Sequence, residues 1–179
     1  MQQPGYCYGG GSEVPLAETF EQEAEALRKQ LPAEIAHYHT SPMQRCRRLA
    51  EHLIPEAVWQ VDSRLSEIHF GDWEGRPWEQ LEGALLDAWM ADFVTIAPPG
   101  GESTLQLEER AKSFLGDIAA EDAGGTHLAI AHGGLIRTMV ASAIGLPLDH
   151  LYQIDVPCGC VVELSRRHDR WQLEKLMAP

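Results

Sequence analysis

The feature that most constrains the fold is the stretch THLAIAHGGLIRTM, residues 126–139. A short apolar run over His127–Ala131 is followed at once by His132, two glycines and a helical pattern over 135–144. This order predicts a buried strand, a tight turn and a helix, with His132 at the carboxyl end of the strand. Glycines at such a turn let backbone N–H groups approach a ligand at the helix N-terminus, where the partial positive charge favours an anion such as phosphate. The alternative is a histidine that only completes a turn.

The apolar pattern in the rest of the chain predicts alternating strands and helices. A chain of 179 residues with 44% apolar residues can form one sizeable core, so residues 1–179 are expected to be a single domain. Further helices are expected at 17–31, 41–53, 78–93 and 103–118, and further strands at 35–39, 58–61, 152–156, 161–164 and 171–176. The alternation predicts a three-layer α/β/α fold with a mainly parallel sheet and an antiparallel C-terminal hairpin. Ligands in such folds bind beyond the carboxyl ends of the strands.

Local signals mark where some elements begin. Ser41 with Pro42 is typical of a helix N-terminus, with the serine as N-cap. Ser103 and Gln106 have the spacing of a capping box. The segment 1–15 is rich in glycine and proline and has no apolar periodicity, so we expect a loop outside the core.

The net charge of −13 limits the partners of the chain. Nucleic acids and anionic membranes need a basic surface, so neither is expected as a partner. No apolar run approaches the roughly 18 to 20 residues that span a bilayer, and no signal peptide is recognisable at Met1, so a cytoplasmic protein is expected. Among fourteen Lys and Arg residues, Arg45, Arg47 and Arg48 follow a predicted strand, where a cluster facing an anionic ligand would lie. The four cysteines lack paired metal-ligand spacing and are expected to be reduced core thiols.

Four pieces of the sequence, taken in order, carry a resemblance to a known family. They are SPMQRCRRLA (41–50), LSEIHFGDWEG (65–75), PPGGES (98–103) and AHGG (131–134). Together they resemble the histidine phosphatase superfamily, the phosphoglycerate-mutase-like enzymes. GYCYG and PLA near the start are similar to the corresponding pieces of α-ribazole phosphatases, which act late in cobalamin synthesis. The resemblance implies a hydrolase of phosphate monoesters that acts on a small phosphorylated metabolite and needs neither a metal nor another cofactor.

The resemblance also implies roles for five residues. Arg45 matches the family's phosphate-binding arginine, and a guanidinium suits a phosphoryl group because it donates two parallel hydrogen bonds. Glu67 matches the proton donor to the leaving group. His132 matches the histidine that binds the phosphoryl oxygens and stabilises charge during transfer. Gly133 could offer a backbone N–H to the phosphate, and Ser41 could orient the arginine or contact an oxygen, although either can be structural.

Other residues have competing interpretations. Glu74 is the nearest rival to Glu67 for the acid role, and the preference is for Glu67. His37 and His39 alternate on one predicted strand, but no third ligand stands at a suitable spacing, so no metal site is expected. The tryptophans in 73–78 could line a substrate pocket or pack in the core.

The chain departs from the family at one decisive point. The family's first strand ends in Arg-His-Gly and carries the histidine that attacks phosphorus, and neither the strand nor the motif is present in residues 1–179. We therefore expect a sheet that lacks its first central strand, with unpaired neighbours facing an apolar groove. We expect residues 1–179 alone to have little or no activity. In the family, the histidine that matches His132 lies beside the attacking histidine and not in line with the leaving oxygen.

Three explanations of this departure compete. A start site or boundary set too far downstream is preferred, because Arg45, Glu67 and His132 all remain. A phosphate-binding or regulatory module without turnover is the second, and the use of another histidine as nucleophile is the third. A phosphoglycerate-mutase-like phosphotransferase is a further alternative to a hydrolase. The oligomeric state is left open.

Overall fold

The computed structural model describes residues 5–121 and 125–178. Its helices are α1 (Phe20–Arg28), α2 (Gln44–Leu53), α3 (Ala84–Ala91), α4 (Thr104–Ala120) and α5 (Gly133–Ile144). Its strands are β1 (His37–Thr40), β2 (Gln60–Val61), β3 (His127–Ile130), β4 (Val161–Arg167) and β5 (Arg170–Met177). Short 3-10 helices lie at Ser63–Leu65, Gly71–Trp73, Trp78–Gln80 and Leu148–Gln153. Within this part of the chain, no helix combines the length and apolarity needed to cross a membrane.

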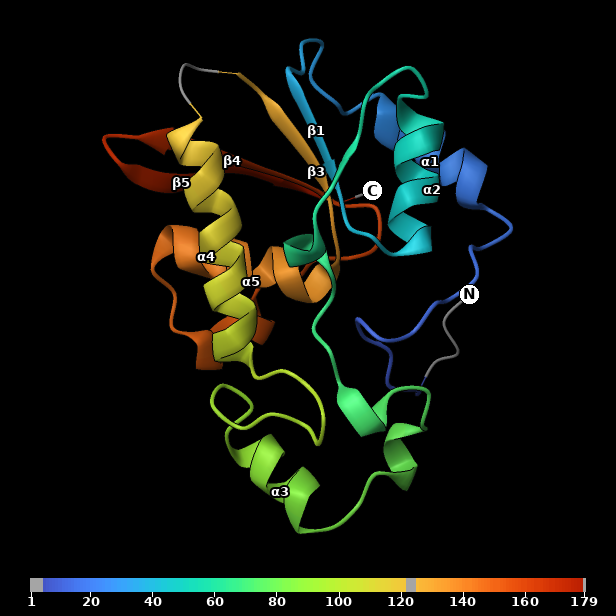
Figure 1. Ribbon diagram of the computed structural model, residues 1–179, viewed down its shortest axis with the longest axis vertical. Coiled ribbons are helices and arrows are strands. Elements are labelled where there is room, and N and C mark those ends of the chain that lie inside the picture. The colour runs from blue at the N-terminus through green and yellow to red at the C-terminus, as the bar shows by residue number, and fades with distance from the viewer. Residues whose placement is uncertain (1–4, 122–124, 179) are drawn as a thin grey trace.

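The strands form two separate sheets. β2, β1 and β3 make a parallel sheet in that order, in which His37 lies opposite His127 and Thr40 opposite Ile130. β4 and β5 make an antiparallel hairpin, and its two turn residues, His168 and Asp169, have φ of 50° and 64°. Helices α1 and α2 lie on one side of the parallel sheet and α4 and α5 on the other (Figure 1). The predicted α/β architecture with a C-terminal hairpin is confirmed.

Two hydrophobic clusters hold these layers together. One joins α1, α2 and β3 through Ala24, Cys46, Ala50, Leu53 and Ile130. The other joins α4, α5 and the long segment between β2 and α4, and Phe114, Leu135 and the tryptophans 73 and 89 belong to it. Because each cluster buries one face of amphipathic helices, the helices fix the position of the sheet between them.

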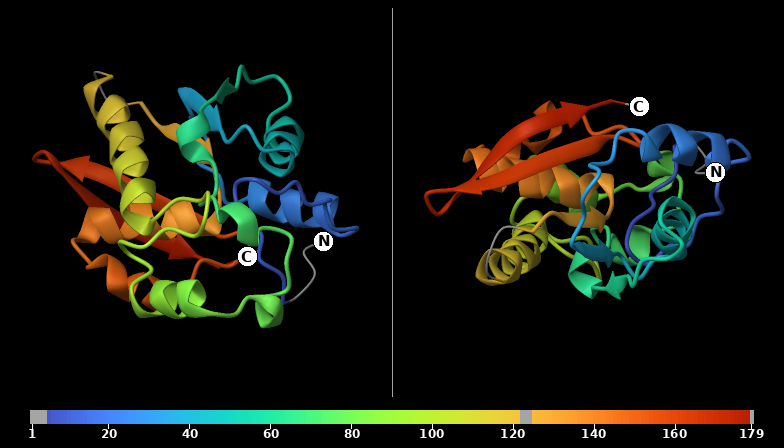
Figure 2. Two further views of the ribbon diagram at one scale, coloured as in Figure 1. Left: turned by 60° about the horizontal axis from the view of Figure 1, so that its bottom comes forward. Right: turned by 90° about the horizontal axis from the view of Figure 1, so that it is seen from above.

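A groove separates the parallel sheet from the hairpin. We call it the β3–β4 groove, since residues 127–131 and 158–166 line it, and it forms a cavity of about 1480 Å³. Within the described part of the chain, β3 pairs with β1 alone and β4 with β5 alone, so each has an edge without a strand partner. Apolar side chains of four helices complete the walls of the groove, among them Leu27, Leu49, Phe114 and Met139. The hairpin packs over α5 and not on β1 (Figure 2), in agreement with the expected gap in the sheet.

Of three local predictions, the structure confirms one and contradicts two. The capping box at Ser103 and Gln106 is confirmed at the start of α4. Ser41 is not the N-cap of α2, which is Met43. The Ser41 hydroxyl lies before the helix, where it accepts from the Met43 N–H at 3.3 Å and contacts the His132 Nε2 at 2.8 Å. The predicted strand at 152–156 is wrong, since a 3-10 helix that buries Leu151 occupies 148–153.

The N-terminal segment is a loop, as predicted, but it does not lie wholly outside the core. Cys7 is fully buried and belongs to the larger hydrophobic cluster. Its backbone N–H donates to the Arg76 carbonyl at 2.9 Å, and its carbonyl accepts from the Gly75 N–H at 2.8 Å. These bonds satisfy the backbone of a buried loop without a regular strand. Residues 1–4 of the predicted loop lie outside the described residues.

Candidate functional site

Arg45 and His132 meet at the carboxyl end of the parallel sheet. Arg45 lies in the first turn of α2, which follows β1, and His132 is the N-cap of α5, which follows β3. Because β1 and β3 are parallel neighbours, the helices that follow them begin at the same edge. The Arg45 Nε donates to the His132 Nδ1 at 3.3 Å. Its Nη1 donates to the Ser12 carbonyl at 2.8 Å and its Nη2 to that of Gly9 at 3.4 Å, so the N-terminal loop orients the guanidinium.

The contacts of His132 define its protonation. A guanidinium has no acceptor, so the Nδ1 that receives the Arg45 bond is unprotonated and the Nε2 carries the hydrogen. The Nε2 lies 2.8 Å from the Ser41 Oγ, to which it donates, and 3.3 Å from the Cys46 Sγ. Burial, together with the positive charges of Arg45 and Arg110, lowers the pKa of His132 to about 3. The imidazole is therefore neutral near pH 7 in the chain without ligand.

Glu67 lies at the N-terminus of α5. Its Oε2 accepts from the backbone N–H of Gly134 at 3.1 Å, and its Oε1 accepts from that of Ile68 at 2.9 Å. The first turn of a helix favours an anion, so this carboxylate occupies a position suited to a negative charge. A Cβ at Gly134 would lie 2.4 Å from the Glu67 Oε1, so the second glycine of the AHGG motif gives the carboxylate room. The amide of Gly134 therefore binds a carboxylate of this chain, and the contact of the Gly133 amide with phosphate stays a prediction.

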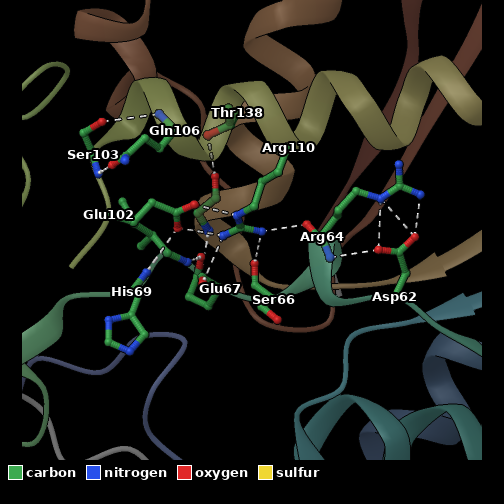
Figure 3. A network of polar contacts seen from close by, with 12 residues as sticks. Asp62, Arg64, Ser66, Glu67, His69, Glu102, Ser103, Gln106, Arg110 and Thr138 are labelled. Atoms are coloured by element: carbon green, nitrogen blue, oxygen red, sulfur yellow. Dashed lines mark hydrogen bonds and ion pairs between the residues drawn. The ribbon is translucent and has the colours of Figure 1, made fainter. Parts of the chain in front are cut away.

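Arg110 holds the segment that carries Glu67 (Figure 3). It extends from α4, and its Nη1 donates to the carbonyls of Arg64 and Ser66, both at 2.6 Å. Its Nη2 donates to the Glu67 carbonyl at 3.1 Å. The same guanidinium binds both carboxylate oxygens of Glu102, at 2.7 and 3.0 Å. Arg110 thereby fixes the backbone of Glu67 to the long helix α4.

Glu74 has a different environment from Glu67. Its carboxylate accepts from the backbone N–H groups of Gly11 at 2.9 Å and Phe70 at 3.0 Å, and from the Ser12 hydroxyl. Its side chain is 8% exposed. Glu74 thus anchors the loop whose carbonyls bind Arg45, which favours Glu67 over Glu74 for the acid role.

Several predicted residues lie elsewhere. Arg47 and Arg48 are exposed on α2, so the prediction of a three-arginine cluster facing the ligand is wrong, and of these three Arg45 alone lines the cavity. Helical spacing explains the direction of Arg47, which lies about 200° around the helix from Arg45. Trp73 is buried in the larger hydrophobic cluster, and Trp78 packs against that cluster while partly exposed.

The cysteines divide into two groups. Cys7 and Cys46 are buried, as predicted for core thiols, whereas Cys160 is half-buried and Cys158 is exposed. Burial raises the pKa of the Cys46 thiol to about 12 although Arg45 opposes the shift. The thiol beside His132 is therefore uncharged near pH 7.

Sequence reasoning missed two contributors to this site. Arg110 precedes a buried helix position, Ala111, and nothing in the sequence distinguishes it from a surface arginine. The carbonyls of residues 9–12 bind Arg45 only because the loop folds back over α2, which no local pattern encodes. The run Gly9–Gly11 is the one available signal, because a Cβ at Gly9 would lie 2.3 Å from the Ile68 carbonyl oxygen.

Arg45, Glu67 and His132 all line the β3–β4 groove. The fold and this arrangement define a class, the α/β proteins in which polar side chains gather at the carboxyl ends of parallel strands. A sequence model of the histidine phosphatase superfamily (branch 1) matches residues 2–178. The chain therefore belongs to the histidine phosphatase superfamily.

Named relatives refine this comparison. A glucosyl-3-phosphoglycerate phosphatase of Mycolicibacterium vanbaalenii is 33% identical over 99 residues, which is 50% of this chain and 44% of the relative. The adenosylcobalamin/α-ribazole phosphatase of Salmonella typhimurium is 26% identical over 167 residues, covering 86% of this chain and 79% of the relative. The crystal structure of the α-ribazole phosphatase from Shigella flexneri superimposes with a TM-score of 0.86 at 22% identity, over 96% of this chain and 88% of that one. The match to the mycobacterial relative thus spans less than half of its length.

Proposed function

We propose that this chain supplies the phosphate-binding and proton-donating groups of a phosphate monoester hydrolase of the phosphohistidine type. The observation that carries the proposal is that Arg45, Glu67 and His132, which come from distant parts of the sequence, line a single cavity. Membership of the histidine phosphatase superfamily supports the same reaction class.

Each of the three side chains has a role in this proposal. Arg45 binds two phosphoryl oxygens with its planar guanidinium, giving up its contact with His132. The negative charge of the phosphate raises the pKa of His132, which then donates a hydrogen bond to a phosphoryl oxygen. Glu67 gives a proton to the leaving oxygen and later removes one from the water that hydrolyses the phosphohistidine.

His132 is poorly suited to attack phosphorus itself. Its Nε2 donates to Ser41, and in the chain without ligand its Nδ1 accepts from Arg45. With phosphate bound, we propose that Nδ1 carries the proton that it donates to a phosphoryl oxygen, so neither nitrogen then has a lone pair for attack. We propose that an extended segment in the β3–β4 groove carries the attacking histidine. The edges of β3 and β4 offer backbone groups for pairing with such a strand, and Arg45 lines the same groove. The proposed source of the segment is chain that precedes residue 1 in the full protein.

The substrate proposed for the complete protein is a small phosphorylated metabolite, with α-ribazole 5′-phosphate of cobalamin synthesis as the first candidate. The similarity to adenosylcobalamin/α-ribazole phosphatase over 86% of this chain supports that choice. A second cavity of about 450 Å³ adjoins Glu67 and is lined by Ser66, His69, Gln106 and Arg110 among others. Because it borders the proposed proton donor, it is the proposed location of the leaving alcohol.

The test compares residues 1–179 with a chain extended at its N-terminus by about ten residues, an apolar strand that ends in Arg-His-Gly. Hydrolysis of p-nitrophenyl phosphate is expected in the extended chain and not above background in the shorter one. Changing the added histidine to Ala should abolish activity, and Glu67→Gln should reduce it by about 100-fold or more. Equal rates in both chains, lost in the His132→Ala variant, would show that the nucleophile is assigned wrongly.

A phosphate-binding module without turnover is the second candidate. Within the described part of the chain, the hydrogen bonds of Arg45 reach no imidazole other than His132, which favours binding over covalent chemistry. This candidate predicts that phosphate raises the melting temperature of the chain, that Arg45→Met removes the effect, and that the extended chain still hydrolyses nothing. Activity in the extended chain excludes it. A panel containing α-ribazole 5′-phosphate and glucosyl-3-phosphoglycerate then ranks the substrates.

A further inference from the structure

Three side chains with metal-binding atoms meet at the amino end of the parallel sheet. They are His37 at the start of β1, His127 at the start of β3 and Glu121 at the end of α4. One donor atom of each lies within 4.8 Å of the others. We propose that these residues form a binding site for a divalent transition metal, with Zn²⁺ as the favoured ion.

The strand register creates the histidine pair. His37 and His127 are opposite each other in the parallel ladder of β1 and β3. Their rings are stacked, with centroids 4.3 Å apart and 17° between the planes. Two imidazoles on adjacent strands are therefore held side by side by backbone pairing, before any metal is present. Because the lone pairs of imidazole lie in the ring planes, at least one ring must turn out of the stack for both nitrogens to reach one ion, and the strand pairing keeps the two residues close enough for this.

His39 gives the pair a supporting contact. It is 5% exposed, and its Nε2 lies 3.1 Å from the Nδ1 of His127. One ring nitrogen of His127 thus has a hydrogen-bond partner, and the other remains for a metal. Histidine ligands in metal sites usually have such a partner on the second nitrogen, which fixes the tautomer and the ring orientation. His39 itself is held by an edge-to-face contact with Phe114 of α4.

The electrostatic environment favours a cation at this position. Glu121 is the C-cap residue of α4, where the helix end carries partial negative charge and a carboxylate is unfavourable without a cation. A metal ion would be attracted both to the Glu121 carboxylate and to the negative end of the helix. Gly125 borders the pair, since a Cβ there would lie 3.5 Å from the His37 Nε2. Two imidazoles and one carboxylate are a ligand set typical of Zn²⁺ with a fourth position left to water.

His127 and Glu121 border the same groove as Arg45 and His132, but they lie at the opposite end of β3. His127 begins β3 and His132 follows its end, so about five residues of extended chain, roughly 16 Å, lie between them. A metal here would join β1, β3 and the end of α4, three elements distant in sequence. Its predicted effect is therefore to stabilise the sheet beside the β3–β4 groove, and it takes no part in phosphate chemistry.

Zinc titration of the chelator-treated chain 1–179 tests the proposal, with calorimetry for stoichiometry and thermal unfolding for the effect on stability. One equivalent of Zn²⁺ should bind and raise the melting temperature. Removal of a ligand in His127→Gln or His37→Gln should weaken binding by more than the roughly 10- to 100-fold loss expected for the supporting variant His39→Gln. Co²⁺ should give the visible absorption of a four-coordinate site, and that spectrum should be lost in the ligand variants.

Two further variants keep the test decisive. Glu121 is exposed, so Glu121→Gln leaves the fold intact and should still weaken Zn²⁺ binding. His150→Gln is the matched control, because His150 is an exposed histidine outside the cluster. This variant should bind Zn²⁺ with the same affinity as the parent chain. The absence of saturable binding, or equal losses in His127→Gln and His150→Gln, would overturn the proposal and indicate only scattered binding to surface histidines.

Discussion

Replacing Arg110 by Met removes a guanidinium that binds four different partners. The carbonyls of Arg64 and Ser66 lose bonds of 2.6 Å, that of Glu67 loses one of 3.1 Å, and Glu102 loses its ion pair. Removing one partner of a buried ion pair costs about 3–5 kcal/mol. Because the side chains of Arg110 and Glu102 are each 17% exposed, we expect the lower end, about 3 kcal/mol. For a chain of this size that loss lowers the melting temperature by about 6–12 °C.

Urea unfolding followed by far-UV circular dichroism measures this loss. In Arg110→Met most of the cost comes from the carboxylate of Glu102 left without its partner, so adding Glu102→Gln should recover about 1–2 kcal/mol. Arg167→Met, on the exposed hairpin, is the control and should change stability by less than about 0.5 kcal/mol. If Arg110→Met loses no more stability than Arg167→Met, the hydrogen bonds of Arg110 do not hold the segment that carries Glu67, and the reasoning is refuted.

Two further predictions concern a titration and a backbone conformation. His132 has a pKa of about 3 in the folded chain and 6.5 when unfolded, so below pH 6.5 only the unfolded state takes up its proton, and this group's contribution to stability falls as pH decreases. The stability difference between the parent chain and His132→Gln should therefore shrink by about 2 kcal/mol from pH 6.5 to pH 5 in urea unfolding, and a constant difference would contradict the low pKa. Gly71 has φ of +57° and a Cβ there would lie 2.0 Å from a backbone carbonyl oxygen, so Gly71→Ala should cost about 2 kcal/mol or more. Gly75→Ala, with φ of +74° and nothing within 4 Å, should cost only about 1 kcal/mol in the same denaturation assay.

The sequence predicted those parts of the fold that depend on local pattern. The apolar run before His132, the glycines after it and the capping box at Ser103 each encode their own geometry, and all three lie where expected. The strand expected at 152–156 failed because its first two residues belong to a 3-10 helix, Leu148–Gln153, that buries Leu151 and packs near α5, a tertiary requirement that periodicity does not record.

The candidate site was predictable to a different degree. Arg45, Glu67 and His132 could be named from motifs, yet their roles remain predictions. The contacts of Arg110 with three carbonyls, and of the residue 9–12 loop with Arg45, depend on segments more than thirty residues apart. The sequence analysis paired His37 with His39 and missed two donors, His127, which the strand register places opposite His37, and Glu121, which lies at the end of α4.

The double attachment of Glu67 has a consequence for how such a protein can diversify. Its backbone is fixed to α4 through Arg110 and its carboxylate to α5 through Gly134, so helix packing and not loop conformation determines where the acid stands. The side chain of His69 is 48% exposed and borders the smaller cavity, so a substitution there would change the cavity wall while Glu67 keeps its position. A change of specificity would then need no change in the residues that hold the proposed proton donor.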